Sequence, residues 1–485
     1  MVEIAVIGAG AAGLPTLKNL LEEGFKATAF DRNTEIGGIW NMREDDQPSV
    51  LESEETPSIM LFCSSDPPSQ LELVTYKSWA VNNLILTSGT IANNSTDFGC
   101  YTDFPYPNDS ATYASAREVS LYLRAYADHF DLFPHIRLGT TIHRAKLTTM
   151  EGIEKWELAI TQDSSSKEEL LYFDRLVVAS GSFSTPSQPT IPGLDRFEGR
   201  LMHSAAYKRP ADFNGLRVLV VGTGNTAADV VATLKGHARQ VYWSHRRGAL
   251  ILPRKIKQMP LDHTLTYRST RLGDALAAYF PDFAERLMIR TLEKLQNTVF
   301  NIPSEWDLKP VPLLRHALPI ITDDLVVELE AARAMSVPKI KRVIGKGAVQ
   351  LEDDTVLDEI DAIVFCTGYH KTDWALVGDE LDPTRHTTPR WGSANCSTNH
   401  QLPRLYQNIF SLDRPHSLAY IGVFSGLISG FTMSDLASMA LAQVWKGNSA
   451  LPSAAEMNNH VNMHHNWLYG QRGLMIQPEQ LSTQN

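Results

Sequence analysis

Cysteine is scarce in this chain, and its few copies are isolated. There are 4 cysteines in 485 residues, at Cys63, Cys100, Cys366 and Cys396, and none forms a CxxC or CxxxxC pair. No Cys/His cluster has the spacing of metal ligands. A disulfide framework, a zinc site and the redox-active cysteine pair of a dithiol reductase are therefore not expected. We expect reduced cysteines, no bound metal and, by default, a cytoplasmic protein.

A basic surface and a membrane-spanning apolar segment are missing as well. Lys and Arg number 44 against 55 Asp and Glu, and the net charge of −11 argues against nucleic acid as a partner. The chain starts with MVEIAVIG, which lacks the basic start and longer apolar core of a signal peptide. The uncharged run from Ser417 to Ser434 contains several glycines and serines, and we interpret it as a strand, a loop and a helix start. No integral membrane anchor is expected.

What the chain does contain is a dinucleotide-binding pattern at its start. Ile4 to Ile7 is a continuous apolar run, which predicts a strand buried on both faces. Gly8, Gly10 and Gly13 follow with GxGxxG spacing, and then come a helix and a second strand from Lys26 to Phe30. The first glycine permits a tight turn, the second lets a pyrophosphate approach the backbone, and the third lets the helix pack on the strand.

A second copy of this pattern begins near residue 217. Val218 to Val221 reads as a strand, and Gln240 to Ser244 as the strand that follows the next helix. Between them Gly222, Gly224 and Ala227 repeat the spacing, with alanine at the packing position. The helix start is where phosphate binds. The second cofactor site is therefore predicted to contain Gly222, Gly224, Asn225 and Thr226.

The two copies differ after their second strand. Asp31 and Arg32 stand there in the first copy, and Arg246 and Arg247 stand there in the second. A carboxylate accepts hydrogen bonds from a free ribose but repels a 2′-phosphate, whereas a guanidinium binds that phosphate in a fork. The second site is therefore predicted to take NADP rather than NAD. Which of the two arginines binds the phosphate stays open.

Two further segments indicate how the copies are connected. Asp174–Gly181 and Asp361–Gly368 both read as strands that end in a small residue and glycine, and each follows hairpin-like sequence. The simplest arrangement inserts the second dinucleotide domain into the first, with the chain leaving near Gly181 and returning near Gly368. We predict an α/β fold with two Rossmann-like domains.

Several motifs together resemble the flavin-containing monooxygenases. Phe197, Gly199, His203 and Tyr207 match that family's FxGxxxHxxx(Y/F) fingerprint. Glu35–Trp40 is similar to its GGxW segment, and Phe365–Tyr369 is similar to its FATGY strand end. Tyr76–Asn82 and Asp103–Pro107 resemble its YxS…N and DFPFP segments. The similarity runs in order from about residue 2 to residue 447.

This resemblance implies FAD in the first site and NADPH in the second. The expected domains are a FAD-binding first part at 1–181, an NADPH-binding domain at 182–334, and a second FAD-binding part with a C-terminal tail at 335–485. The family's reaction uses NADPH and O₂ and passes through a C4a-hydroperoxyflavin, which oxygenates an amine or heterocycle nitrogen, or a sulfur, of a small molecule. The oligomeric state stays open, with a homodimer as one option.

The resemblance also completes the set of expected site residues. Asn82 is the expected catalytic residue because a neutral amide can hydrogen-bond the peroxide without supplying a proton to it. The stretch after Asn82 is longer than in the family, so Asn83 is an alternative at the flavin. The cofactor-binding residues expected are Gly8, Gly10, Gly13, Asp31, Arg32, Gly38, Ile39, Trp40, Asn82, Asn83, His203, Tyr207, Gly222, Gly224, Asn225, Thr226, Arg246 and Arg247.

Two other functions stay open at this point. A Baeyer–Villiger oxygenase would act on ketones, although that group's fingerprint ends in Trp where this chain has Tyr207. A non-catalytic, redox-sensing flavoprotein would keep both dinucleotide folds. The substrate is not readable, but a role in secondary metabolism on a nitrogen heterocycle is one option. The stretches Asn83–Gly99 and Leu272–Val299 are candidates for shaping the substrate pocket.

Overall fold

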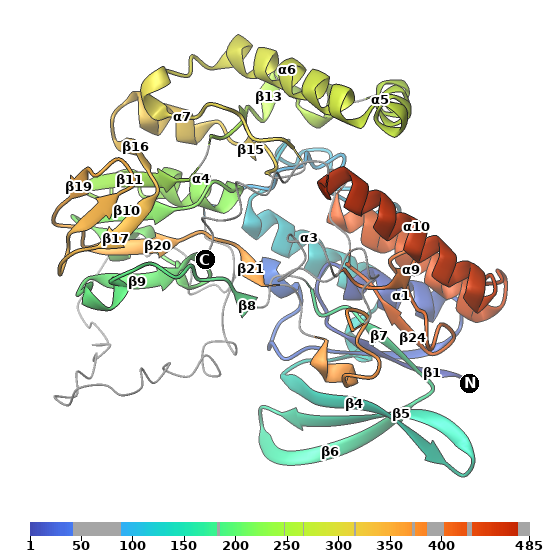
Figure 1. Cartoon of the computed structure of the whole chain (residues 1–485). Coiled ribbons are helices and arrows are strands. Elements are labelled where there is room, and N and C mark those ends of the chain that lie inside the picture. Colours follow the sequence, from blue (N-terminus) through green and yellow to red (C-terminus); the bar gives the residue numbers. More distant parts are fainter. Residues whose placement is uncertain are drawn as a thin grey trace.

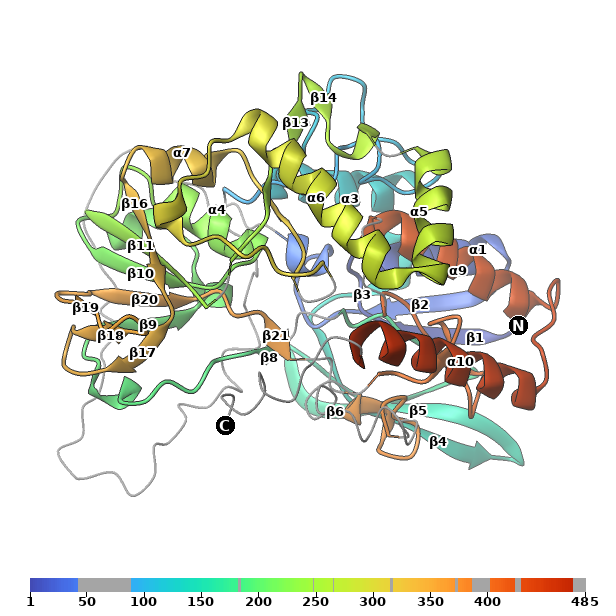
Figure 2. The same cartoon turned by 45° about the horizontal axis from the view of Figure 1, so that its top comes forward.

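Two largely parallel sheets form the centres of two units that lie side by side (Figures 1 and 2). The structure is a computed structural model, and it describes residues 1–41, 89–181, 185–246, 248–264, 266–314, 317–370, 374–385, 402–423 and 429–473. Both sheets have the expected strand–turn–helix–strand pattern, so the α/β fold with two Rossmann-like units is confirmed. Within these ranges no helix is long and apolar enough to cross a membrane.

The first sheet is covered on both faces. Its strands, in spatial order, are β22 (Leu405–Tyr406), β23 (Phe410–Ser411), β24 (Leu418–Tyr420), β7 (Arg175–Val178), β1 (Glu3–Ile7), β2 (Lys26–Phe30) and β3 (Ile136–Arg137). Ile4 and Val6 of β1 pack against a cluster built with α1 (Gly13–Glu22), α3 (Ala116–His129) and α9 (Gly430–Lys446). Ala5 and Ile7 pack on the other face, against β4 (Thr140–Met150), β5 (Ile153–Gln162) and β6 (Ser165–Phe173). This double burial explains the uninterrupted apolar run at the start of the chain.

The second sheet repeats this construction. Its strands, in order, are β16 (Ala334–Pro338), β11 (Gln240–His245), β10 (Arg217–Val221), β20 (Ala362–Phe365) and β9 (Arg200–His203). Val218 and Val220 of β10 face the helices α4 (Asn225–Thr233) and α7 (Asp324–Glu330). Leu219 faces the antiparallel strands β17 (Ile340–Val343), β18 (Val349–Leu351) and β19 (Val356–Leu357). Each parallel sheet thus lies between helices and a three-stranded antiparallel sheet.

Strand pairing corrects one expected domain boundary. β20 pairs with both β10 and β9, so the chain up to Phe365 belongs to the second sheet. The division between 334 and 335 is therefore wrong, because it falls after the first residue of β16 and separates β20 from the sheet to which it belongs and β17 to β19 from the sheet on which they pack. Two short strands, β8 (Thr185–Pro186) and β21 (Tyr369–His370), pair with each other and lie between the two units in Figure 1.

Two peripheral parts complete the described chain. α5 (Tyr267–Tyr279) and α6 (Pro281–Val299) form a helical pair at the top of Figure 1. The C-terminal stretch, expected as a polar tail, contains α10 (Ala454–Gly473), which contacts β22. Shorter strands pair at the edges of the second unit, namely β12 (Ile251–Leu252) with β15 (Ile320–Ile321), and β13 (Lys255–Ile256) with β14 (Met259–Pro260).

The third glycine of the first pattern gives a direct test of this packing. A Cβ at Gly13 would lie 1.8 Å from the carbonyl oxygen of Gly8, and neither backbone can move aside. We expect Gly13→Ala to lower the free energy of unfolding by about 1–3 kcal/mol or more, as overpacking does. Thermal unfolding of the purified variant measures the loss.

Gly273, in the interior of α5, is the matched control. A Cβ there would meet no atom within 4 Å. Gly273→Ala should therefore raise the free energy of unfolding by about 0.5–1 kcal/mol, the helix-propensity gain of alanine over glycine. Equal melting temperatures for the two variants would contradict the packing argument.

Candidate functional site

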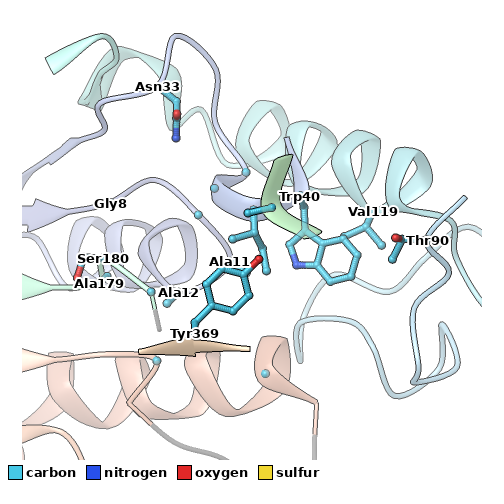
Figure 3. A pocket seen from close by; sticks show the side chains of 18 of the residues that line it. Gly8, Ala11, Ala12, Asn33, Trp40, Thr90, Val119, Ala179, Ser180 and Tyr369 are labelled. Atoms are coloured by element: carbon cyan, nitrogen blue, oxygen red, sulfur yellow. The ribbon is translucent and has the colours of Figure 1, made fainter. Parts of the chain in front are cut away.

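A large pocket of about 1460 Å³ is lined by residues of both units. In Figure 3, Gly8 and Asn33 lie on one side of the view, and Trp40, Val119 and Thr90 lie on the other. The expected site residues that the pocket brings together are Gly8, Gly10, Asp31, Arg32, Gly38, Ile39, Trp40, His203, Asn225 and Thr226. Residues separated by more than two hundred positions along the chain, such as Gly8 and Thr226, therefore share one cavity.

The first glycine turn leaves room for a phosphate. Gly8 has φ +107°, and a Cβ there would lie 2.5 Å from the carbonyl oxygen of Ala179, so the turn requires glycine. α1 then begins at Gly13 with no side-chain cap and no acidic residue in its first turn. The first amide groups of a helix lack partners within it and attract anions. The start of α1 thus fits the pyrophosphate of a dinucleotide.

Asp31 stabilises the glycine turn, in addition to its expected hydrogen bond to a ribose. Its Oδ2 accepts a hydrogen bond of 2.8 Å from the amide of Ala9, inside the glycine turn. Its Oδ1 accepts bonds of 2.9 Å from the backbone and the side chain of Asn33. A carboxylate has about four acceptor positions, so three protein bonds leave room for a ribose hydroxyl. Asp31 therefore fixes the turn and still fits the expected ribose contact at the pocket edge.

The second glycine turn is similar but more open. Gly222 has φ +137°, and a Cβ there would lie 2.3 Å from the carbonyl oxygen of Cys366. Gly224 is the N-cap of α4, and a Cβ at this position would meet no atom within 4 Å. The amide oxygen of Asn225 accepts a 2.7 Å hydrogen bond from the amide of Ile321. The open space beside Gly224 fits the approach of a second pyrophosphate.

Some expected site residues do not line the pocket. Gly13 and Gly222 are pressed against backbone carbonyls, Gly224 borders open space without being one of the lining residues, and Arg246 is exposed directly after β11. Asn82, Asn83 and Arg247 lie outside the described residues, so their expected roles stay predictions. The stretch around residues 90–99 contributes to the lining as proposed, whereas the other candidate stretch, Leu272–Val299, contributes no lining residue in its described part.

Of the fingerprint residues, His203 bonds the segment that crosses between the units, and Tyr207 packs inside the second unit. Nδ1 of His203 accepts a 3.1 Å hydrogen bond from the amide of Ala205, so Nε2 carries the proton and donates to the carbonyl of Gly368 at 2.9 Å. Burial lowers the pKa of His203, which favours this neutral form. Tyr207 does not line the pocket; it is buried, and its hydroxyl lies 2.9 Å from Oγ1 of Thr233 on α4.

The pocket also has an aromatic wall, formed by Trp40, Tyr106 and Phe431, in which the rings of Trp40 and Phe431 are 6.1 Å apart. Trp40 was expected from its motif and Tyr106 lies in the Asp103–Pro107 segment, whereas no motif indicated Phe431. Asp229 on α4 is the second acidic side chain among the lining residues, besides Asp31. Its place could have been read from the sequence, because it follows Asn225 by four residues and so lies on the same helical face.

Comparison with known proteins decides the family. A family model described as flavin-binding monooxygenase-like matches residues 1–69 and 84–477. The chain belongs to this flavin monooxygenase family. It is an FAD-dependent NADPH monooxygenase, and the two glycine turns described above fit these two cofactors. The unmatched stretch, 70–83, contains both Asn82 and Asn83.

Individual relatives agree with this family. The monooxygenase aurF of Gibberella zeae is 39% identical over 96% of this chain and 81% of its own length. The N-oxide-forming dimethylaniline monooxygenase 2 of Cavia porcellus is 30% identical over 94% of this chain and 75% of its own length. Among solved structures, an open form of cyclohexanone monooxygenase has a TM-score of 0.64 at 18% identity, and the match covers 99% of this chain and 97% of that one. That likeness concerns the fold.

The variant Gly224→Ala tests whether NADPH binding in this flavin monooxygenase can be weakened while the folding stability stays unchanged. Gly224 has φ −99° and ψ 173°, which alanine adopts freely, and the added Cβ meets no protein atom within 4 Å. We expect the unfolding free energy without NADP to change by less than about 0.5 kcal/mol. The methyl group would occupy the pyrophosphate space, so the NADPH Kd should rise by roughly 10-fold or more, which is about 1.4 kcal/mol. Thermal unfolding and an NADP titration measure the two effects, and unchanged NADP affinity would contradict the site.

Proposed function

We propose that this enzyme oxygenates a soft nucleophilic heteroatom, an amine or heterocycle nitrogen or a sulfur, of a small organic molecule. The observation that carries the proposal is the single pocket that joins both glycine turns, because it lets a flavin and a nicotinamide meet a substrate in one space. When bound, the flavin supplies the redox chemistry, since it accepts a hydride from NADPH and activates O₂. The oxygen transfer would follow the route that the sequence resemblance implies.

In this proposal the described residues of the pocket bind the cofactors and the substrate and exclude water, and they do not attack the substrate as nucleophiles. Trp40, Tyr106 and Phe431 form an apolar wall that excludes water from the pocket. The described cysteines offer no nucleophile there, because burial raises the pKa of Cys366 to about 12 and also raises that of Cys100. Transfer of oxygen from a cofactor to the substrate needs no attacking side chain. The guinea-pig relative, named for N-oxide formation, supports nitrogen as the acceptor atom.

The experiment is a substrate panel with purified, FAD-loaded protein. NADPH consumption and product mass are followed with amines, thioethers, indoles and ketones. Our proposal expects N-oxides or S-oxides formed in proportion to the NADPH used. A lactone or ester from a ketone would instead favour Baeyer–Villiger oxygenation. If no panel member accelerated NADPH consumption and no oxygenated product appeared, the redox-sensing alternative would be favoured.

Arg246 tests the choice of nicotinamide cofactor. It is exposed and follows β11, where the 2′-phosphate of NADPH is expected. We expect Arg246→Ala to raise the NADPH KM by roughly 10- to 100-fold, about 1.4–2.8 kcal/mol, and to leave the NADH KM nearly unchanged. Arg239, exposed just before the opposite end of β11, provides a control of equal charge. If Arg239→Ala and Arg246→Ala had equal effects, Arg246 would have no special role.

Asn82 tests the oxygenating step. In the family's pattern this asparagine lies beside the flavin, and its amide would hydrogen-bond the bound oxygen species. Loss of one such donor is expected to cost about 2.7–4 kcal/mol, by analogy with an oxyanion-hole donor. Asn82→Ala should therefore consume NADPH and O₂ but release hydrogen peroxide in place of product. Hydrogen peroxide is measured per NADPH, with Asn83→Ala as the neighbouring control. Uncoupling in Asn83→Ala alone would move the role to Asn83.

A further inference from the structure

The loop 89–115 forms part of the pocket wall and is fixed to the first unit. Its residues from Thr90 to Thr96 line the pocket. The amide of Ala92 donates a 2.8 Å hydrogen bond to the carbonyl of Ala114, across the base of the loop. Both alanines also pack against the apolar core that covers β1 and α1. The loop is therefore part of the unit that carries the first glycine turn.

The segment 254–263 is fixed to the second unit in a similar way. The amide of Arg254 donates a 3.1 Å hydrogen bond to the carboxylate of Asp323, the N-cap residue of α7. Two residues earlier, Leu252 pairs with Ile321 where β12 meets β15. This segment therefore belongs to the unit that carries the second glycine turn.

Tyr113 connects the loop to this segment. Its hydroxyl donates a hydrogen bond to the carbonyl of Arg254 and accepts a 3.1 Å bond from the amide of Leu261. These two residues flank the hairpin of β13 and β14, so one phenol holds both ends of the hairpin. Tyr113 is buried, and burial raises the pKa of its hydroxyl to about 12. The hydroxyl therefore stays protonated and able to donate.

Ser95 and Asp262 form a second connection between the units. The amide of Ser95, a fully buried residue, donates a 2.7 Å hydrogen bond to Oδ2 of Asp262. Beside it, Nε2 of His263 lies 3.0 Å from the carboxylate of Asp97. The His263–Asp97 pair is partly exposed, and such pairs contribute little. The buried bond between Ser95 and Asp262 is therefore the stronger of these two contacts.

The loop contacts are separate from the place where the chain crosses between the units. The crossing runs through β8 and β21, where Tyr369 lines the pocket. Figure 3 shows Tyr369 and Thr90 in different parts of the pocket wall, and Figure 2 shows the loop beside β13 and β14. Two units joined at one place can turn about it, and such motion is the default for small interfaces. A second attachment, made by the loop, opposes this rotation.

We propose that Tyr113 and Asp262 are positioning residues for hydride transfer, because they fix the orientation of the NADPH-binding unit relative to the FAD-binding unit. The proposal rests on the two cofactors of this family and not on the heteroatom or the substrate. Neither residue gains or loses a proton or an electron in the transfer. Reacting atoms must be held within about 3–3.5 Å, and a displacement of about 1 Å by a distant change can cost roughly 100-fold in rate.

The first experiment measures amide hydrogen exchange in FAD-loaded protein without NADP. We expect Asp262→Ala to raise the exchange rate in peptides that contain Ser95 by about 10-fold or more, because this amide loses its acceptor. Asp262→Asn keeps an acceptor oxygen and should exchange like wild type. Equal protection in all three proteins would show that the contact does not form. Equal loss in both variants would show that charge rather than the hydrogen bond matters, and either result would overturn the proposal.

The second experiment measures flavin reduction by rapid mixing with saturating NADPH in the absence of oxygen. We expect the rate to fall roughly 10- to 100-fold in Tyr113→Phe and Asp262→Ala, and to stay near wild type in Asp262→Asn. Neither residue lines the pocket, so the Kd of NADP should change by less than about 2-fold. Unchanged reduction rates together with faster exchange at Ser95 would show that the attachment forms without positioning the cofactors, and would overturn the proposal.

Tyr420→Phe is the matched control for Tyr113→Phe. Tyr420 is fully buried, and its hydroxyl donates a 3.1 Å hydrogen bond to the carbonyl of Leu381, which packs against the same core cluster of the first unit. The variant loses the same atom and a buried bond without touching the second unit, so flavin reduction should stay within about 2-fold of wild type. Equally slow reduction in both variants would show a general loss of stability and would overturn the proposal. These measurements involve no substrate, so failure of the heteroatom function would leave them unaffected.

Discussion

Both halves of the molecule depend on one steric constraint, in which a glycine turn is pressed against the carbonyl of a neighbouring strand end. Added Cβ atoms at Gly8 and Gly222 would lie 2.5 Å from the oxygen of Ala179 and 2.3 Å from that of Cys366. The strands that supply these carbonyls, β7 and β20, follow their turns only after long stretches of chain. Each turn is therefore complete only when the chain returns to it. The inserted arrangement shows in β24, which pairs with β7 after the chain has built the second sheet.

The same constraint fixes where the two cofactor sites meet. Ligands of open parallel sheets bind beyond the carboxyl ends of the strands, and here both sets of strand ends border one pocket. The chain crosses between the units beside these ends, through β8 and β21. His203 bonds the end of β9 to Gly368, just before β21. His203 thus holds the end of β9 to the segment that crosses between the units beside the pocket.

The sequence predicted the features that are local along the chain. Apolar runs identified β1, β2, β10 and β11, and glycine spacing identified the turns between them. The boundary after Ala334 was wrong because β17 to β19 are short amphipathic strands, whose pattern does not say which sheet they cover. Asp229 was missed although it follows Asn225 by one helical turn, because its partners Arg254 and Thr90 come from distant parts of the chain.

The two copies of the dinucleotide-binding pattern share one fold but differ at particular positions. Gly13 cannot carry a Cβ, because that atom would lie 1.8 Å from the oxygen of Gly8, whereas the equivalent Ala227 is buried with its methyl group. Correspondingly, α1 begins at Gly13, five residues after its first glycine, and α4 begins at Asn225, three residues after its own. The two helices therefore approach their turns differently although the strands agree. The polar difference between Asp31 and Arg246 lies where each copy is predicted to bind the ribose of its own dinucleotide.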